Sequence, residues 1–130
     1  MGMAPLRPLA TRIAIGIYVA CFAIGTLNHG RDFLARGWRP YAHAPPPIEA
    51  FWTALIGLDA AAVALLLLGR RRAGLLLAVG IMTADVAVNT YASLDPRLPM
   101  IPAALLGQAV FLGFVLGSVG FLWPTRDAPA

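Results

Sequence analysis

The chain has 130 residues, of which 59% are hydrophobic and only 12% are charged, and its mean hydropathy is +0.75. Soluble domains carry about 25% charged residues, so this composition excludes most soluble folds. All ten basic residues are arginine, and with six acidic residues they give a formal charge of +4. Because the arginines separate long apolar runs and do not gather on one solvated face, nucleic-acid binding is not expected. The length fits a single domain over residues 1–130.

Four apolar runs are each long enough to cross a bilayer. A hydrocarbon core of about 30 Å needs about 20 helical residues. The runs predict transmembrane helices at about 10–28, 48–68, 73–92 and 101–123, followed by a disordered tail at 124–130. Since these spans leave no room for a separate soluble domain, the sequence predicts an all-α integral membrane four-helix bundle.

The connections indicate how the helices are arranged. The first connection is long, from about Asn28 to Pro47, and it ends in Pro45-Pro46-Pro47. Between the second and third spans only Gly69-Arg70-Arg71-Arg72 remains, which predicts a tight hairpin with a C-capping glycine and antiparallel neighbours. Another short turn is expected at 95–99.

The distribution of arginine predicts the orientation in the membrane. With both termini in the cytoplasm, six arginines lie on the inner side and four on the outer side. These are Arg7, Arg12, Arg70, Arg71, Arg72 and Arg126 against Arg31, Arg36, Arg39 and Arg97. The sequence therefore favours an N-in, C-in arrangement. The absence of lysine is typical of a GC-rich bacterial genome, so we expect a bacterial inner membrane.

Two acidic residues lie inside the predicted spans. A charge at the bilayer centre costs about 2.5–3.5 kcal/mol on insertion, which makes each of them a candidate functional residue. At 1.5 Å per residue, Asp59 lies about 16 Å from the outer end of its span and Asp85 about 18 Å from the inner end of its span. Both carboxylates are thus expected at a similar depth on antiparallel neighbours. A structural alternative is a proton shared between them that holds the two helices together.

Most other polar side chains of the spans fall between the outer surface and the midplane, which predicts a polar cavity that is closed at its cytoplasmic end. Asn89 lies one helical turn from Asp85 on the same face. The predicted ligand-binding residues are Asp59, Asp85, Asn89, Gln108, Thr53, Trp52, His29 and Asp32. Plainer interpretations remain open for Asn89 and Gln108 as interhelical hydrogen-bond partners, for His29 as an exposed residue at a helix end, and for Trp52 as an interfacial anchor.

Other residues are expected to serve the membrane environment. Trp38, Tyr41 and Trp123 are typical of interfacial aromatic belts. On the fourth span, Gly113 and Gly117 have the spacing of close helix packing or of a dimer face. No zinc-ligand spacing, phosphate-binding loop or nucleophile motif occurs, so no metal, cofactor or catalytic residue is predicted.

The long first connection and the segment Pro45-Pro46-Pro47-Ile48-Glu49-Ala50-Phe51-Trp52 give a pattern that resembles the EXPERA family of four-helix membrane proteins. The resemblance spans roughly Ile13 to Trp123. Members, which include the sigma-2 receptor and the emopamil-binding sterol isomerases, bind sterol-like or cationic amphiphilic molecules through paired membrane-embedded acids. The resemblance implies that Asp32 and Asp59 take the places of these acids. Isomerase members also carry a His near a Glu on the second helix, and this chain has no His there.

The sequence therefore predicts a membrane protein that binds a lipid-like or amphiphilic cationic small molecule in the outer half of its bundle. Two alternatives remain. One is a structural or assembly subunit, as a homo-oligomer or in a larger complex, that docks through Gly113 and Gly117. The other is a proton-coupled transporter or a lipid-modifying isomerase, in which Asp59 and Asp85 would relay protons.

Overall fold

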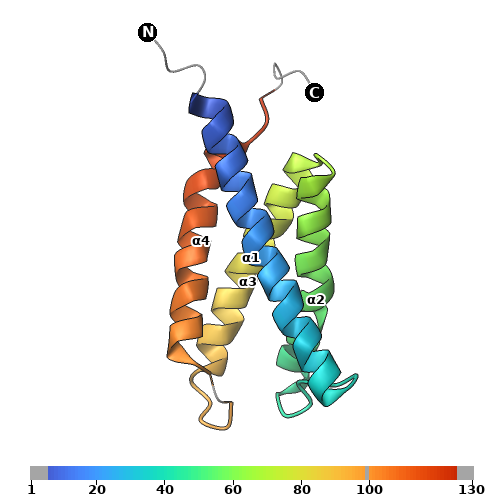
Figure 1. Ribbon diagram of the computed structural model, residues 1–130. Coiled ribbons are helices and arrows are strands. Elements are labelled where there is room, and N and C mark those ends of the chain that lie inside the picture. Colours follow the sequence, from blue (N-terminus) through green and yellow to red (C-terminus); the bar gives the residue numbers. More distant parts are fainter. Residues whose placement is uncertain (1–5, 99, 126–130) are drawn as a thin grey trace.

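The computed structural model describes residues 6–98 and 100–125, and within these ranges the chain forms four helices and no strand. The helices are α1 (Leu6–Arg36), α2 (Pro46–Leu67), α3 (Arg71–Ala92) and α4 (Pro102–Leu122). All four are long and apolar enough to cross a membrane, which confirms the predicted all-α chain with four candidate spans. Successive helices pack side by side, and α4 closes the bundle against α1 over a smaller contact (Figure 1).

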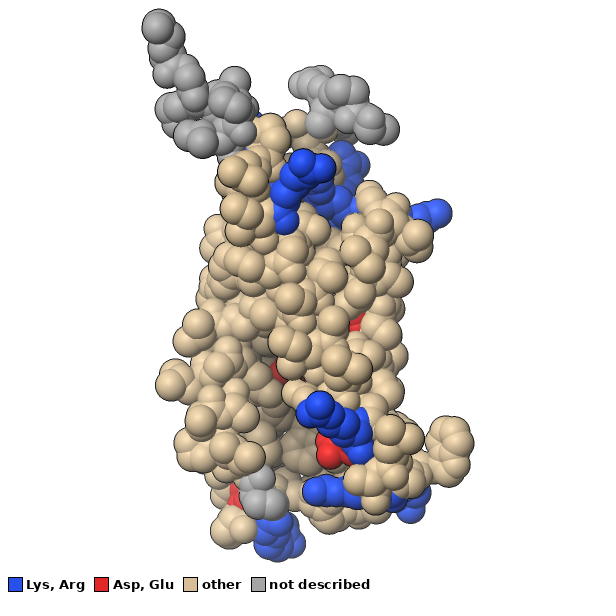
Figure 2. Space-filling model, in the orientation of Figure 1, with Lys and Arg blue, Asp and Glu red and all other residues tan. Residues whose placement is uncertain are grey.

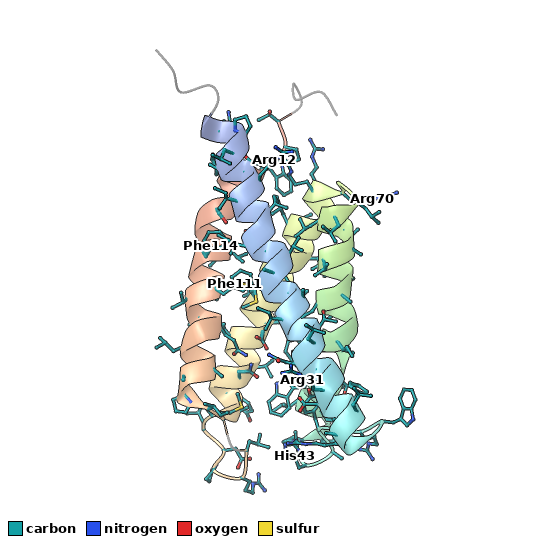
Figure 3. The ribbon with its side chains drawn as sticks, viewed as in Figure 1. Arg12, Arg31, His43, Arg70, Phe111 and Phe114 are labelled. Atoms are coloured by element: carbon teal, nitrogen blue, oxygen red, sulfur yellow. The ribbon has the colours of Figure 1, made fainter. Side chains whose placement is uncertain are left out.

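The two ends of the bundle are built differently. The start of α1, the α2–α3 turn and the end of α4 form what we call the terminal end, and the other two connections form the loop end (Figure 1). Charged side chains gather at both ends, with an almost uncharged belt between them (Figure 2). Arg12 and Arg70 mark the terminal end, whereas Arg31 and His43 mark the loop end (Figure 3). This distribution is typical of a bundle that crosses a membrane.

The first helix is longer than the predicted span of 10–28. Polar residues and Gly30 after position 28 suggested a helix end, but the backbone stays helical until Arg36. The helix stops at Gly37, whose φ of +79° is a left-handed conformation that glycine adopts without strain. The first connection is therefore 37–45 and not 28–47. His29 and Asp32 lie near the C-terminal end of the first helix, as expected, but in its last turns and not in a loop.

The other helices begin and end within two residues of the predicted positions. Beyond α4, Pro124 and Thr125 are not helical, and the rest of the expected tail, 126–130, lies outside the described residues.

The α2–α3 hairpin has the predicted C-capping glycine. Gly69 has φ +73°, its N–H donates to Leu66 O at 3.2 Å, and Arg70 N–H donates to Leu65 O at 2.8 Å. These two bonds form a Schellman motif, which satisfies the last carbonyl groups of α2. One turn into α3, Gly74 lies so close to Leu66 that a Cβ atom there would stand 2.8 Å from Leu66 Cγ. The hairpin thus brings α2 and α3 into close contact at the terminal end.

A buried tyrosine joins α1 to α4 nearer the terminal end. The Tyr18 side chain is fully buried, and its hydroxyl lies 3.0 Å from both Val115 O and Ser118 Oγ. Phe111 and Phe114 pack against its ring, with centroid distances of 6.0 and 5.7 Å. From this contact α1 runs diagonally across the bundle toward α2 (Figures 1 and 3). The helices α1 and α4 are therefore held together at one end and diverge toward the other.

Gly113 and Gly117 of α4 point out of the bundle. Both are exposed, and a Cβ atom at either position would meet nothing within 4 Å. The expectation of close packing at these glycines within the chain is therefore wrong, since they face away from α1 and α3.

The close approach at Gly74 gives a matched test of packing. Gly74→Ala should lower the free energy of unfolding by about 1–3 kcal/mol, because the new methyl group overlaps Leu66. Gly80→Ala, on the same helix but with nothing within 4 Å, should be neutral or stabilising by up to about 1 kcal/mol. Thermal unfolding in detergent compares the two variants, and equal effects would contradict the packing seen here.

Candidate functional site

Two adjoining cavities lie in the loop-end half of the bundle. We call them the loop cavity, of about 340 Å³, and the central cavity, of about 380 Å³. They share His29, Leu55, Asp85 and Gln108 as a common wall. Figure 2 shows a hollow in this half of the molecule, with acidic atoms inside it. Together the two cavities have the size of a small-molecule site.

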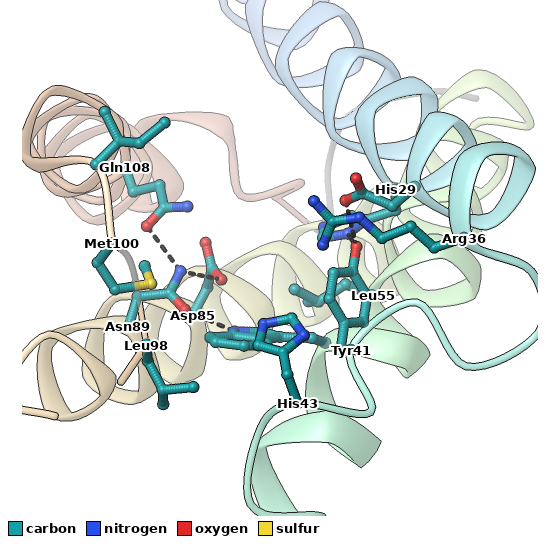
Figure 4. Close-up of a pocket in the computed structure, with 13 residues that line it drawn as sticks. His29, Arg36, Tyr41, His43, Leu55, Asp85, Asn89, Leu98, Met100 and Gln108 are labelled. Atoms are coloured by element: carbon teal, nitrogen blue, oxygen red, sulfur yellow. Dashed lines mark hydrogen bonds between the residues drawn. The ribbon is translucent and has the colours of Figure 1, made fainter. Parts of the chain in front are cut away.

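Polar and apolar groups divide between the two cavities. The loop cavity is lined mainly by polar and aromatic side chains, which are His29, Asp32, Arg36, Tyr41, His43, Trp52, Asp85, Asn89 and Gln108 (Figure 4). The central cavity is mostly apolar, with Phe22, Ile24, Leu55, Ile81, Met82 and Phe111 in its wall. The site therefore combines a polar chamber at the loop end with an apolar chamber deeper in the bundle.

Asn89 on α3 connects three helices through its side-chain amide. Its Oδ1 accepts the indole N–H of Trp52 on α2 at 2.7 Å. Its Nδ2 donates to Asp85 Oδ1 and to Gln108 Oε1 on α4, each at 2.9 Å. Trp52 is thus a buried hydrogen-bond donor and not a lipid-facing anchor (8% exposed). These bonds fix the polar side chains on which the loop cavity depends (Figure 4).

A second hydrogen-bonded group joins α1 to the first connection. The hydroxyl of Tyr41 donates to Asp32 Oδ2 at 2.7 Å, and Tyr41 Oη also lies 2.7 Å from His29 Nδ1. Tyr41 was expected at the membrane interface, but it is 7% exposed and packs on Trp52 with a ring distance of 5.6 Å. Burial and the bond to Asp32 raise the pKa of Tyr41, so its hydroxyl stays protonated at neutral pH.

An ion pair positions the connection that carries Tyr41. Arg39 donates two hydrogen bonds to Glu49 in the first turn of α2, Nε to Oε1 at 2.9 Å and Nη2 to Oε2 at 2.8 Å. Such a two-point contact fixes orientation as well as distance. It holds the connection across the mouth of the loop cavity, with Pro40 and Pro45 limiting the backbone on either side of Tyr41.

The two membrane-embedded acids both line the central cavity, but they do not bond to each other. Asp85 accepts its hydrogen bond from Asn89. Asp59 lies against α1 at Gly25, where a side chain would overlap the carboxylate. The hydrogen bonds of the described residues do not include Asp59, and no polar side-chain atom in these ranges is both buried and without a partner. The Asp59 carboxylate therefore opens onto the cavity.

Seven of the eight predicted site residues line these cavities, and Thr53 does not. The sequence interpretation missed Tyr41, Arg36 and His43. A signal for them was present, because a Tyr and a His stand between prolines in a connection that must cross a polar bundle end. No group of three or more His, Cys, Asp or Glu side chains in the described part of the chain is arranged to hold a metal ion.

Comparison with known proteins gives no relative. No family model matches the chain, and neither does a curated protein or a solved structure. The function must therefore be argued from the cavities themselves.

The hydrogen bonds of Asn89 should contribute measurably to stability. Asn89→Leu keeps the side-chain volume but leaves Trp52, Asp85 and Gln108 without their shared partner, so we expect a loss of about 2 kcal/mol. Thr90→Val at the next, exposed position is the control, since the Thr90 hydroxyl bonds only to Val86 O of its own helix. Thermal unfolding in detergent measures both, and an unchanged Asn89→Leu variant would contradict the network.

Proposed function

We propose that the protein is a membrane-embedded binding protein for a lipid-like or amphiphilic cationic small molecule. The observation that carries this proposal is the set of polar atoms left after the internal hydrogen bonds are counted. Asn89 is fully used, because its oxygen and both of its N–H groups have partners. In the central cavity these atoms include the carboxylate oxygens of Asp59 and Oδ2 of Asp85, whereas the N–H donors of Arg36 line the loop cavity.

Two carboxylates keep free acceptors in the central cavity. Asp85 uses only Oδ1, which leaves Oδ2 free, and Asp59 opens onto the central cavity. Ionised carboxylates accept hydrogen bonds and cannot donate them. Because an isolated charge within a bilayer is costly, a bound cation that neutralises either acid stabilises the complex. The central cavity, which is lined by both acids and by no arginine, therefore favours an ammonium group over an anion.

The apolar chamber favours a hydrocarbon tail in the same ligand. Phe22, Ile24, Ile81, Met82 and Phe111 line the central cavity beside Asp59 and Asp85. Residues of both α1 and α4 line it, on the side where these two helices diverge. We propose that a ligand places its head group near Asp85 and Asp59 and its tail among these apolar side chains, and that it enters from the bilayer between α1 and α4.

The EXPERA resemblance supports the same ligand class. In that family paired acids bind sterol-like or cationic amphiphilic molecules. In this chain Asp59, which lies on the second helix, lines the central cavity. We further propose that the terminal end faces the cytoplasm, because five of the nine arginines in the described residues lie there, three of them at Arg70–Arg72, and that the membrane is a bacterial inner membrane. No reaction is assigned to the site.

Neutralising either acid tests the binding function. The probe is N,N-dimethyldodecylamine, protonated at pH 7, added to protein in zwitterionic nanodiscs. Binding is followed by Trp52 emission in a Trp38→Phe, Trp123→Phe background, since Trp52 lines the loop cavity. Asp85→Asn and Asp59→Asn should each weaken binding about tenfold or more, because the bound cation loses an opposite charge in a medium of low dielectric constant.

The matched control is Asp95→Asn. Asp95 bonds to Arg97 in the α3–α4 connection and lines neither the loop cavity nor the central cavity. Its substitution should leave the affinity unchanged. Normal binding by both Asp85→Asn and Asp59→Asn would contradict the proposed function.

A second candidate function is assembly through α4, either with another copy or in a larger complex. It is favoured by the outward position of Gly113 and Gly117, which leaves a flat strip of backbone open to close contact. Within the chain these glycines contact no other helix, so a packing role would need a partner.

If the protein assembles through this strip, substitutions in it should lower the mass of the purified particle. Gly113→Leu and Gly117→Leu should shift the protein toward the monomer when the mass of the purified particle is measured in mild detergent. Gly16→Leu on α1, another glycine with nothing within 4 Å, should have no effect. A wild-type protein that is monomeric across concentrations excludes homo-oligomer formation.

A further inference from the structure

Asp32, Tyr41 and His29 form a chain of hydrogen bonds at the mouth of the two cavities. Asp32 and His29 lie three residues apart on one face of α1. Tyr41 reaches between them from the first connection, with its hydroxyl oxygen 2.7 Å from Asp32 Oδ2 and 2.7 Å from His29 Nδ1. Both distances are short enough for strong hydrogen bonds.

The chemistry of the three groups fixes where each proton lies. An ionised carboxylate can only accept, so the single hydroxyl hydrogen of Tyr41 is directed to Asp32. The Tyr41 oxygen must then accept the second bond, and His29 Nδ1 must carry the hydrogen that it donates. In a neutral imidazole only one nitrogen is protonated, so Nε2 keeps its lone pair. The cluster therefore selects one tautomer of His29.

The free nitrogen faces the ligand chamber. His29 lines both cavities, and no described polar side-chain atom is buried without a partner, so Nε2 opens onto this space. The other charged or titratable groups around the two cavities are Cys21, Arg36, His43, Asp59 and Asp85. Gln108 is the neutral neighbour that shares the same wall. His29 Nε2 is thus an acceptor on the wall that the two cavities share.

We infer that the Asp32–Tyr41–His29 chain makes His29 Nε2 an acceptor that selects amines bearing an N–H group. This inference rests on the proposed function and specifies its ligand class. The two acids respond to positive charge, which a quaternary ammonium also carries. A neutral imidazole nitrogen instead needs a hydrogen to accept, so His29 favours a protonated tertiary amine over a quaternary ammonium of the same chain length.

Two amines that differ in one group test the selection. The probes are N,N-dimethyldodecylamine, which has an N–H when protonated, and dodecyltrimethylammonium, which has none. Affinities are measured by Trp52 emission in nanodiscs, as for the acidic variants. We expect the wild type to prefer the tertiary amine about tenfold beyond any preference of protein-free nanodiscs.

Variants of the chain separate selection from folding. His29→Phe should remove most of the preference, whereas His29→Gln, whose side-chain oxygen can accept near the position of Nε2, should keep it. Tyr41→Phe should reduce the preference, because the tautomer is no longer fixed. A preference that survives in His29→Phe overturns the inference, as does its loss in His29→Gln when that variant still binds dodecyltrimethylammonium with wild-type affinity.

The tautomer can also be observed directly without any ligand. His43→Gln leaves His29 as the one histidine of the sequence. In ¹⁵N NMR of this histidine-labelled variant, the His29 signals should show an unprotonated Nε2 and a protonated Nδ1. Tyr41→Phe should move the signals toward a tautomer mixture. A protonated Nε2 in the wild type overturns the inference.

The binding results distinguish the two levels of the proposal. Binding of neither amine by the wild type overturns the proposed function and the inference with it. Equal binding of both amines, with dependence on Asp59 and Asp85, overturns the inference and supports the proposed function.

Discussion

The arrangement of this bundle depends on how a polar amide is accommodated between apolar helices. Asn89 could not lie at this position without partners, since each unpaired polar group away from water costs free energy. Its partners come from α2 and α4 as well as from its own helix. One side chain therefore sets the relative positions of three helices, and α1 is free to take a different path. The cavities lie where that path departs from the other three.

The contacts of α1 explain why the polar chamber is confined to one half of the bundle. Near the terminal end, Tyr18 and the aromatic side chains of α4 fill the space between α1 and α4. Farther along, Gly25 leaves room for the Asp59 carboxylate, and Gly107 lines the central cavity without a side chain to fill it. Small residues at one depth and large aromatic residues at another thus give the bundle a closed end and an open end.

Hydropathy was sufficient to predict the four helices, because a bilayer demands apolar runs of nearly fixed length. Asp59, Asp85, Asn89 and Gln108 could be placed near each other for the same reason, since depth along each helix follows from counting residues. The end of α1 could not be found in this way. Gly30 and Gly37 look alike in the sequence, and only the second adopts a positive φ. The position of Tyr41 among the site residues was missed, because its hydroxyl bonds to Asp32 and His29 on another element and sequence spacing does not reveal such contacts.

The length of α1 makes the tilt of this helix depend on the thickness of the surrounding bilayer. At 1.5 Å per residue its 31 residues span about 46 Å, whereas α2 to α4 are about 31–33 Å long. A helix of that length matches the same hydrocarbon thickness only when it tilts. Because α1 is fixed to α4 at Tyr18, a larger tilt moves its loop-end half farther from α4. Bilayer thickness thereby becomes a mechanical variable that sets the width of the opening between these two helices.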